Sequence, residues 1–263
     1  MRLLVLEKVL KSNSIELLGL EFETSRSGKC FIIDYQNCTN ITVMFYDPIF
    51  AVKCTMSNLR RGEVNNPFSP RVYGKGFIGI GKYSHKDVKL YKLWSGMLER
   101  AYSSKLHNKL PTYKDVTVCK DWLCLQNFAE WCENQEFFKT KDNKDKYYHL
   151  DKDILVKGNK VYSPETCCFV PAEINTLFVS RRNDRGDYPL GVHLESSTGK
   201  FKAQLSYLGK RLCLGAFNTE HKAFNSYKLA KENLIKDIAN KWRGKIDLKV
   251  YTSLMNYEVE ITD

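Results

Sequence analysis

Residues 147–175 read YYHLDKDILVKGNKVYSPETCCFVPAEIN, a stretch whose composition predicts strands, turns and a helix in close succession. Tyr147–Leu150 has the aromatic and apolar composition of a short strand. The strand ends in an acidic segment that contains Asp151 and Asp153. A glycine and an asparagine at 157–159 then predict a turn.

The second half of the stretch predicts a returning strand and a helix. The chain comes back through 160–162, turns again at 163–165, and continues through the apolar run 167–170. Pro171 suits the first position of a helix, where its missing N–H costs nothing. Asn175 then lies one turn into the helix, and we expect it to face back toward the end of the first strand.

Strand, loop, strand and helix, with acids at the strand end and an amide on the helix, is the layout of a ββα-metal nuclease. In such a site the first strand supplies a general base and a metal ligand, and the helix supplies another ligand. Carboxylate and amide oxygens suit a hard divalent cation, which stabilises charge on a scissile phosphate. We therefore predict that Asp151, Asp153 and Asn175 bind Mg²⁺ or another divalent cation.

A longer pattern carries a family resemblance. The stretch resembles a phage group of HNH endonuclease-like proteins, and the likeness extends over roughly Tyr73 to Phe178. The residues that carry it are Trp94, Met97–Tyr102, Pro111–Tyr113, Val118–Cys119, Trp122–Leu123, Leu150–Asp153, Tyr162–Cys167, Phe169–Pro171 and Ile174–Asn175. The resemblance implies a DNA endonuclease that hydrolyses phosphodiester bonds with a metal ion, and it does not distinguish mobile-element homing from host takeover.

The first motif departs from that of ordinary HNH enzymes, which resembles His-x-Asp-Gly. Asp151 stands at the histidine position, Asp153 at the aspartate position, and Ile154 replaces the glycine. Asn175 matches the terminal ligand. The middle asparagine of the family falls near Thr166 and is missing.

This departure leaves two functions open. Asp151 stands where the family has its base, but an aspartate is a weak base at neutral pH. His149, two residues earlier on the same strand face, is the second candidate for the catalytic base. If neither acts, the chain is a non-catalytic DNA-binding or regulatory protein on a degenerate HNH scaffold.

The C-terminal part predicts a three-stranded sheet with one helix. The strands are expected at 191–195, 200–205 and 211–214, separated by glycine-containing turns. Thr219 is a suitable N-cap for a long amphipathic helix. Its apolar face is expected to carry Ala223, Tyr227, Ala230, Leu234 and Ile238.

Strand alternation in this sheet predicts a basic face. Phe201, Ala203 and Leu205 share one face of the middle strand, and polar residues share the other. Arginine and glutamine on a sheet face can pair with base edges in the major groove, and lysine with phosphates.

The same region resembles the ethylene-response-factor (APETALA-type) DNA-binding domain through Gly191–Val192, Phe201, Ala203, Leu214–Gly215, Phe217 and Ala223. The resemblance puts His193, Lys200, Gln204 and Arg211 at DNA-contacting positions, and the alternation adds Lys202. Cys213 and Glu195 depart from the plant pattern of tryptophan and arginine, so base specificity does not carry over.

Upstream of residue 84 the chain predicts a small antiparallel β domain, a curled sheet or barrel, from the runs 31–35, 41–45 and 50–54. Gly74 to Gly81 contains a formal G-x-G-x-x-G match, but the polar connector 83–87 follows it where a dinucleotide site needs a helix. A third function, an adaptor that binds a protein partner through this β domain, stays open. Helical spacing then begins at Val88 and recurs to Gln135.

Composition supports a DNA-binding protein. The 263 residues carry a formal net charge of +11, which attracts polyanions. Nine cysteines without framework spacing indicate a reducing compartment. Short apolar stretches and a charge-interrupted start at 1–7 predict no membrane segment and no secretory signal. We expect a cytoplasmic location, in the host cell if a phage encodes the chain.

The expected architecture is a multidomain α+β chain. Its parts are a β domain at 1–83, a helical plus HNH-like ββα module at 84–180, a sheet-plus-helix DNA-binding domain at 187–245, and a tail at 246–263.

Overall fold

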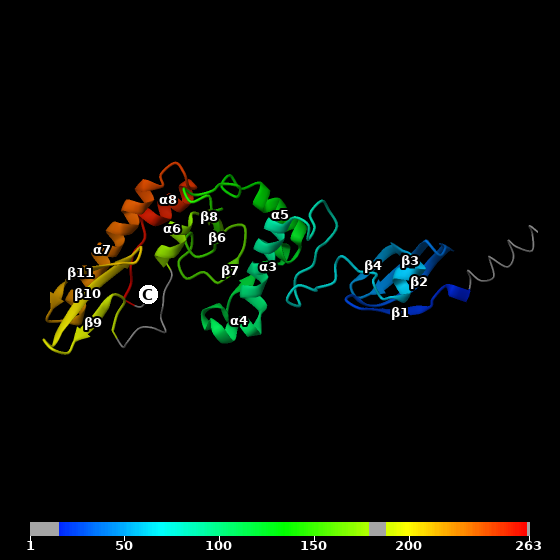
Figure 1. Cartoon of the computed structure of the whole chain (residues 1–263), viewed down its shortest axis with the longest axis horizontal. Coiled ribbons are helices and arrows are strands. Elements are labelled where there is room, and N and C mark those ends of the chain that lie inside the picture. The colour runs from blue at the N-terminus through cyan, green and yellow to red at the C-terminus, as the bar shows by residue number, and fades with distance from the viewer. Residues whose placement is uncertain (1–15, 179–187, 262–263) are drawn as a thin grey trace, which may run out of the picture. The chain divides into compact units, whose positions relative to one another are not determined.

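The structure is a computed structural model that describes residues 16–178 and 188–261. The chain divides into two compact units, Met1–Cys132 and Glu133–Asp263. Each unit combines helices with strands, and their labels are those of Figure 1. The α+β class predicted from the sequence is therefore confirmed.

The first unit begins with a sheet of four antiparallel strands in the order β1-β2-β3-β4. The strands are β1 (Glu21–Thr24), β2 (Gly28–Asn37), β3 (Asn40–Tyr46) and β4 (Ile49–Cys54), followed by the short helix α2 (Met56–Arg60). Alternation decides which face is buried, because Ile41, Val43 and Phe45 of β3 are fully covered while the residues between them are half-buried. The sheet is an open meander rather than a barrel, with β1 and β4 at its edges.

The second half of this unit is mainly helical. Its elements are α3 (Val88–Tyr102), α4 (Ser104–Lys109), η1 (Pro111–Tyr113), β5 (Thr117–Val118), η2 (Lys120–Leu123) and α5 (Leu125–Glu133). The spacing of Leu90, Trp94 and Leu98 correctly predicts the buried face of α3. Trp94 donates its indole N–H to the carbonyl of Trp122 at 2.8 Å, which joins α3 to η2.

The second unit contains two groups of elements. The first comprises β6 (His149–Asp151), β7 (Val161–Tyr162), β8 (Cys168–Val170), α6 (Ala172–Asn175) and η3 (Thr176–Phe178). The second comprises β9 (Val192–Glu195), β10 (Lys200–Tyr207), β11 (Lys210–Phe217), α7 (Glu220–Lys241) and α8 (Leu248–Met255). Strands β11, β10 and β9 form one antiparallel sheet in that order.

Helix α7 lies along one face of the β9–β11 sheet, as Figure 1 shows. It begins at the predicted N-cap, where Thr219 accepts a hydrogen bond from the backbone N–H of Lys222. Ala203, Leu205 and Tyr227 are among the residues that close the core between the sheet and the helix. The apolar face of α7 and the core face of the sheet therefore agree with the sequence prediction.

The C-terminal segment belongs to this core and is not a separate tail. Val259 is 2% exposed and packs in the same cluster as Ala203 and Tyr227. Its backbone N–H donates to Glu232 at 2.9 Å, and its carbonyl accepts from Lys228 at 2.7 Å. The predicted limits of the C-terminal domain, 187–245, are thus too narrow at their C-terminal end.

The boundary between the units also differs from the predicted domains. It falls inside the predicted module 84–180, close to the charged connector 136–146. One cause is local pairing, because the backbone N–H of Phe77 donates to Leu123 and that of Leu125 donates to Phe77. The helices after residue 84 are thereby joined to the N-terminal unit.

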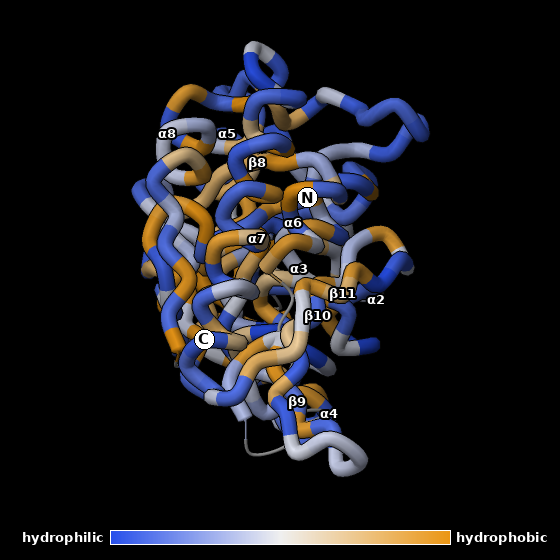
Figure 2. The backbone as a smooth tube through the Cα atoms, turned by 90° about the vertical axis from the view of Figure 1, so that its left-hand side faces the viewer, coloured by the Kyte–Doolittle hydropathy of each residue, from blue (hydrophilic) through white to orange (hydrophobic). Residues whose placement is uncertain are grey.

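Hydrophobic stretches along the chain are short and interrupted by hydrophilic ones (Figure 2). Within the described residues, none of the helices has both the length and the apolar character needed to cross a membrane. Residues 1–7, on which the argument against a secretory signal rests, lie outside the described part.

The packing of α7 gives a test of the fold at Gly191. Gly191 has φ +75, and a Cβ there would overlap the ring of Tyr227. Gly199, with φ +69, has nothing within 4 Å of its Cβ position. Gly199→Ala should therefore cost about 1 kcal/mol of stability from left-handed strain alone. Gly191→Ala should cost a further ~1–3 kcal/mol from overpacking.

Urea denaturation of both variants beside the parent chain measures this difference. Equal losses would contradict the close packing of Tyr227 against Gly191.

Candidate functional site

The face of the β9–β11 sheet that α7 leaves uncovered is the first candidate site, and we call it the open face. Strand register defines it, because directly opposite residues share a face. Lys202 pairs with His193 on one side and with Ala216 on the other. By the same register, the open face consists of His193, Glu195, Lys200, Lys202, Gln204, Ser206, Arg211, Cys213 and Ala216.

All five residues predicted to contact DNA lie on this face. His193, Lys200 and Arg211 are exposed, while Lys202 and Gln204 are half-buried. A β-bulge between Ala203 and Gln204 shifts the register with β11. The neutral side chains of the face include hydrogen-bonding groups able to read base edges.

One lysine of the open face is already paired. Lys202 donates to Glu195, and Thr198 donates to the other oxygen of the same carboxylate at 2.8 Å. The hydrogen bond from Lys202 is the main cause that lowers the pKa of Glu195, and the same bond raises the pKa of Lys202. Lys202 therefore keeps its proton but contributes less net positive charge than strand alternation predicts.

Lys200 and Arg211 carry the net charge of the face. Among the residues that the structure describes, no acidic side chain forms an ion pair with either of them. Their positive charge is therefore available to an anionic partner. The five residues predicted to contact DNA therefore lie on one surface, where Glu195 balances the positive charge of Lys202.

The second candidate site is built on β6, β8 and α6. The sequence predicts that β6 is followed by a strand at 160–162 in the ββα layout. In the structure β6 pairs with β8 instead, with His149 opposite Val170 and Asp151 opposite Cys168. All three residues of β8 are buried, and pairing with β6 satisfies backbone groups that water cannot reach.

His149 and Asn175 are in contact. The Asn175 Nδ2 lies 3.3 Å from the His149 Nδ1, and His149 is exposed at the start of β6. Pro171 is the N-cap of α6 rather than its first residue, but Asn175 still faces the strand as predicted. Asp151 lies on the same face of β6 as His149, roughly 7 Å further along the strand.

The two aspartates have other partners. Asp151 Oδ1 accepts hydrogen bonds from the backbone N–H groups of Asp153 and Ile154, at 2.7 and 2.9 Å. Burial raises the pKa of Asp151, and the two backbone hydrogen bonds oppose that shift. Asp153 forms an ion pair with the buried Lys152.

These contacts decide which oxygen atoms of the predicted metal site are left for a cation. Asn175 faces His149 through Nδ2, which leaves its Oδ1 able to coordinate a cation. Asp151 accepts both of its described hydrogen bonds through Oδ1, which leaves its Oδ2. Asp153 is paired with Lys152 through Oδ1, so a divalent cation bound at Asp153 would lie beside that ammonium group. Within the described residues, no group of three or more histidine, cysteine, aspartate or glutamate side chains could hold a metal ion.

The side-chain hydrogen bonds of Asn159 are the first feature that sequence reasoning missed, although the sequence places this residue in the predicted turn 157–159. Its Nδ2 donates to the carbonyls of Lys152 and Val161, at 2.8 and 2.7 Å, and its Oδ1 accepts from the backbone N–H of Val161. These hydrogen bonds hold together the loop between β6 and β7. The alignment with the HNH motif looked for an asparagine near Thr166 instead.

Glu173 is the second missed residue, and it joins the two candidate sites. Its carboxylate accepts from the Tyr207 hydroxyl at 2.5 Å, from the Trp242 indole N–H at 2.7 Å, and from Lys241 at 2.7 and 2.8 Å. These donors lie in β10 and at the end of α7. Desolvation raises the pKa of Glu173, but the hydrogen bonds from Lys241, Tyr207 and Trp242 outweigh it and lower the pKa overall.

Comparisons of the chain with protein-family models, curated proteins and solved structures gave no match.

The Glu173 network predicts a dependence of stability on pH. Because the folded-state pKa of Glu173 is lowered, its contribution is present above the ordinary value of 4.5 and is lost as the pH falls through the folded value. Glu173→Gln should cost about 2 kcal/mol at neutral pH, the typical worth of hydrogen bonds to a charged group. The difference from the parent chain should shrink in acid.

Urea denaturation of the full chain at several pH values measures this contribution, with Glu136→Gln as the control because Glu136 is exposed in the same unit. A loss for Glu173→Gln that stays constant with pH would argue against a charged network.

Proposed function

We propose that this chain binds duplex DNA through the open face of the β9–β11 sheet. The observation that carries the proposal is the gathering of His193, Lys200, Gln204 and Arg211 on one uncovered face. Helix α7 packs on the opposite face, so the sheet can present its open face without exposing the core.

The chemistry of the face suits a nucleic acid. Lys200 and Arg211 can neutralise phosphates, and arginine can also bond a guanine edge through two donors. Gln204 sits opposite Cys213 near the middle of the sheet, where an amide can pair with adenine. Strands are known to enter DNA grooves in this way.

Glu195 lowers the net positive charge of the open face. It forms an ion pair with Lys202 at the centre of the face and so cancels the positive charge of that lysine. Binding should consequently depend on Lys200 and Arg211 more than on Lys202. The net charge of +11 over the whole chain supplies a further, sequence-independent attraction.

A second candidate function is metal-dependent hydrolysis of DNA at β6, β8 and α6. The observation that favours it is the contact of His149 with Asn175, with Asp151 on the same strand face. Asp151 and Asn175 would supply protein oxygens to a divalent cation, and His149 would hold or accept a proton. When bound, such an ion stabilises charge on a phosphate. Without that ion the same scaffold is a non-catalytic DNA-binding protein.

The proposal for DNA binding is tested at Arg211. Arg211→Ala should weaken duplex binding by about 1–3 kcal/mol if the guanidinium contacts a base, whereas a charge away from the interface should matter little. Lys222→Ala is the matched control, because Lys222 is exposed in the first turn of α7. Titrations of the full chain at fixed salt compare the two variants.

In the same titration, Glu195→Gln should change the affinity for DNA in the opposite direction. It frees Lys202 and removes a negative charge, so affinity should rise. Equal losses for Arg211→Ala and Lys222→Ala, with no gain for Glu195→Gln, would mean diffuse electrostatic binding instead.

Hydrolysis is tested by nicking of a supercoiled plasmid with Mg²⁺, with Mn²⁺ and with EDTA. His149→Ala should slow nicking by roughly 10²–10⁴-fold, the usual contribution of a general base. His221→Ala is the control, since His221 is exposed on α7. A chain that binds duplex DNA but nicks it with neither metal supports the non-catalytic alternative.

A further inference from the structure

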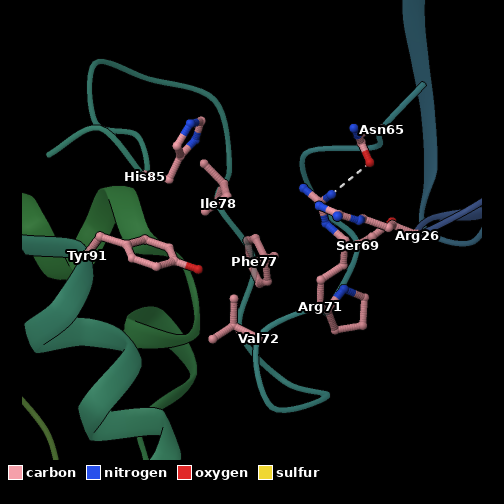
Figure 3. Close-up of a pocket in the computed structure, with 11 residues that line it drawn as sticks. Arg26, Asn65, Ser69, Arg71, Val72, Phe77, Ile78, His85 and Tyr91 are labelled. Carbon is pink, nitrogen blue, oxygen red and sulfur yellow. Dashed lines mark hydrogen bonds between the residues drawn. The ribbon is translucent and has the colours of Figure 1, made fainter. Parts of the chain in front are cut away.

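We infer that the first unit contains a separate binding site for a nucleoside monophosphate group, with the phosphate held by Arg26 and Arg71. The site is a cavity of about 690 Å³ within that unit, and Figure 3 shows the residues that line it. It goes beyond the proposed function, because neither the open face nor the β6–β8–α6 site contributes to it.

The arginines reach the cavity from different parts of the chain. Arg26 lies in the turn between β1 and β2, and Arg71 lies in the loop before the glycine segment. Asn66 connects these two parts: its backbone N–H donates to Ser27 at 3.0 Å, and its side chain donates to Pro48 at 2.7 Å. Because Asn66 is fully buried, it fixes the loop against the turn.

Arg26 and Arg71 line one wall of the cavity, and the described residues give their positive charge no acidic partner. Arg71 Nη1 donates to the amide oxygen of Asn65 at 2.8 Å, a neutral partner. Burial lowers the pKa of Arg71, and the like charge of Arg26 adds to the shift. Among the described residues, no carboxylate pairs with either arginine. Two guanidinium groups on one cavity, one of them bonded to a neutral amide, match an oxyanion that accepts several charge-assisted hydrogen bonds.

Ser69 gives an independent indication of a missing partner. Its residue is 4% exposed and lines the cavity beside Arg71. Its hydroxyl is the one buried side-chain oxygen or nitrogen in the described residues that has no hydrogen-bond partner. A buried hydroxyl without a partner is costly, and a ligand oxygen within the cavity would satisfy it.

The opposite wall suits an aromatic base. Phe77, Ile78 and Tyr91 line it, and Figure 3 shows the Tyr91 hydroxyl pointing from α3 toward the middle of the gap. Aromatic side chains bind bases by stacking, at about 1–3 kcal/mol per base and with little sequence preference. A phosphate at one wall and a base at the other together describe a nucleotide.

This site does not use the G-x-G-x-x-G match as a phosphate cradle. A Cβ at Gly76 would overlap Leu98 and approach Trp94, and one at Gly81 would overlap Gln126. These two glycines therefore allow the chain to pass close to α3 and α5, as the rejection of a dinucleotide fold from the sequence implies. That close passage is what puts Phe77 and Ile78 on the cavity wall.

Calorimetric titration of the full chain with AMP, with adenosine and with inorganic phosphate tests the site. AMP should bind at least about tenfold more tightly than adenosine, the equivalent of one hydrogen bond to a charged group. Arg71→Ala and Arg26→Ala should each weaken AMP binding by about tenfold or more on the same basis. Arg26 is exposed, so its variant keeps the test valid if Arg71→Ala fails to fold.

Arg61→Ala is the matched control, because Arg61 pairs with Glu63 and lies outside the cavity. Arg211→Ala should leave AMP binding unchanged, which separates this site from the proposed DNA surface. No binding of AMP, equal binding of AMP and adenosine, or unchanged AMP affinity in both Arg26→Ala and Arg71→Ala would overturn the site.

The nucleotide could come from a free pool or from the end of a DNA strand. In the Arg211→Ala background, a 5′-phosphorylated oligonucleotide that competes with AMP, when its 5′-hydroxyl form does not, would identify the end of a DNA strand as the ligand. AMP binding without such competition assigns the free nucleotide.

Discussion

The organisation of the second unit depends on one carboxylate. Glu173 sits on the short helix α6, with its side chain 16% exposed, and receives donors from β10 and from the end of α7. A four-residue helix has too few internal hydrogen bonds to hold itself in place, so its position comes from these contacts. Tyr148 adds a second connection, because its hydroxyl donates to the carbonyl of Lys245 at 3.0 Å. The candidate site on β6, β8 and α6 (the strand–helix site) and the β9–β11 sheet are consequently parts of one compact unit rather than two domains joined by a linker.

This arrangement changes how the proposed functions relate to each other. A nuclease domain joined to a DNA-binding domain by a flexible linker could move independently of it. Here His149 and Asn175 belong to the same unit as Lys200 and Arg211. The two proposed sites therefore belong to one compact unit. His149 contacts Asn175 at the strand–helix site, while Lys152 forms an ion pair with Asp153. The hydrogen bonds of Glu173 support the sheet whether or not this region hydrolyses DNA.

Local sequence patterns predicted the elements whose partners are near in sequence. Strands β2 to β4, the buried face of α3, the N-cap Thr219 and the alternation of β10 all follow from side-chain period and turn chemistry. The open face followed as well, because alternation and hairpin register decide it. The pairing of β6 with β8 was missed, since both are three-residue strands with little periodicity. The Lys202–Glu195 pair lies within one hairpin, but alternation alone does not say which side chains of a face pair. The contacts of Glu173 and the packing of Val259 depend on which distant segments meet in space, and no local pattern encodes that.

The open face offers a direct measurement through its own cysteine. Cys213 is exposed on that face opposite Gln204, while Cys38 is exposed in the first unit, at the turn between β2 and β3. Alkylation rates of the two thiols, followed by peptide mass spectrometry with and without duplex DNA, compare the two surfaces within one molecule. If DNA binds through the open face, duplex DNA will slow alkylation of Cys213 and leave that of Cys38 unchanged. An unchanged rate at Cys213 under conditions in which the chain is saturated with DNA would contradict that surface.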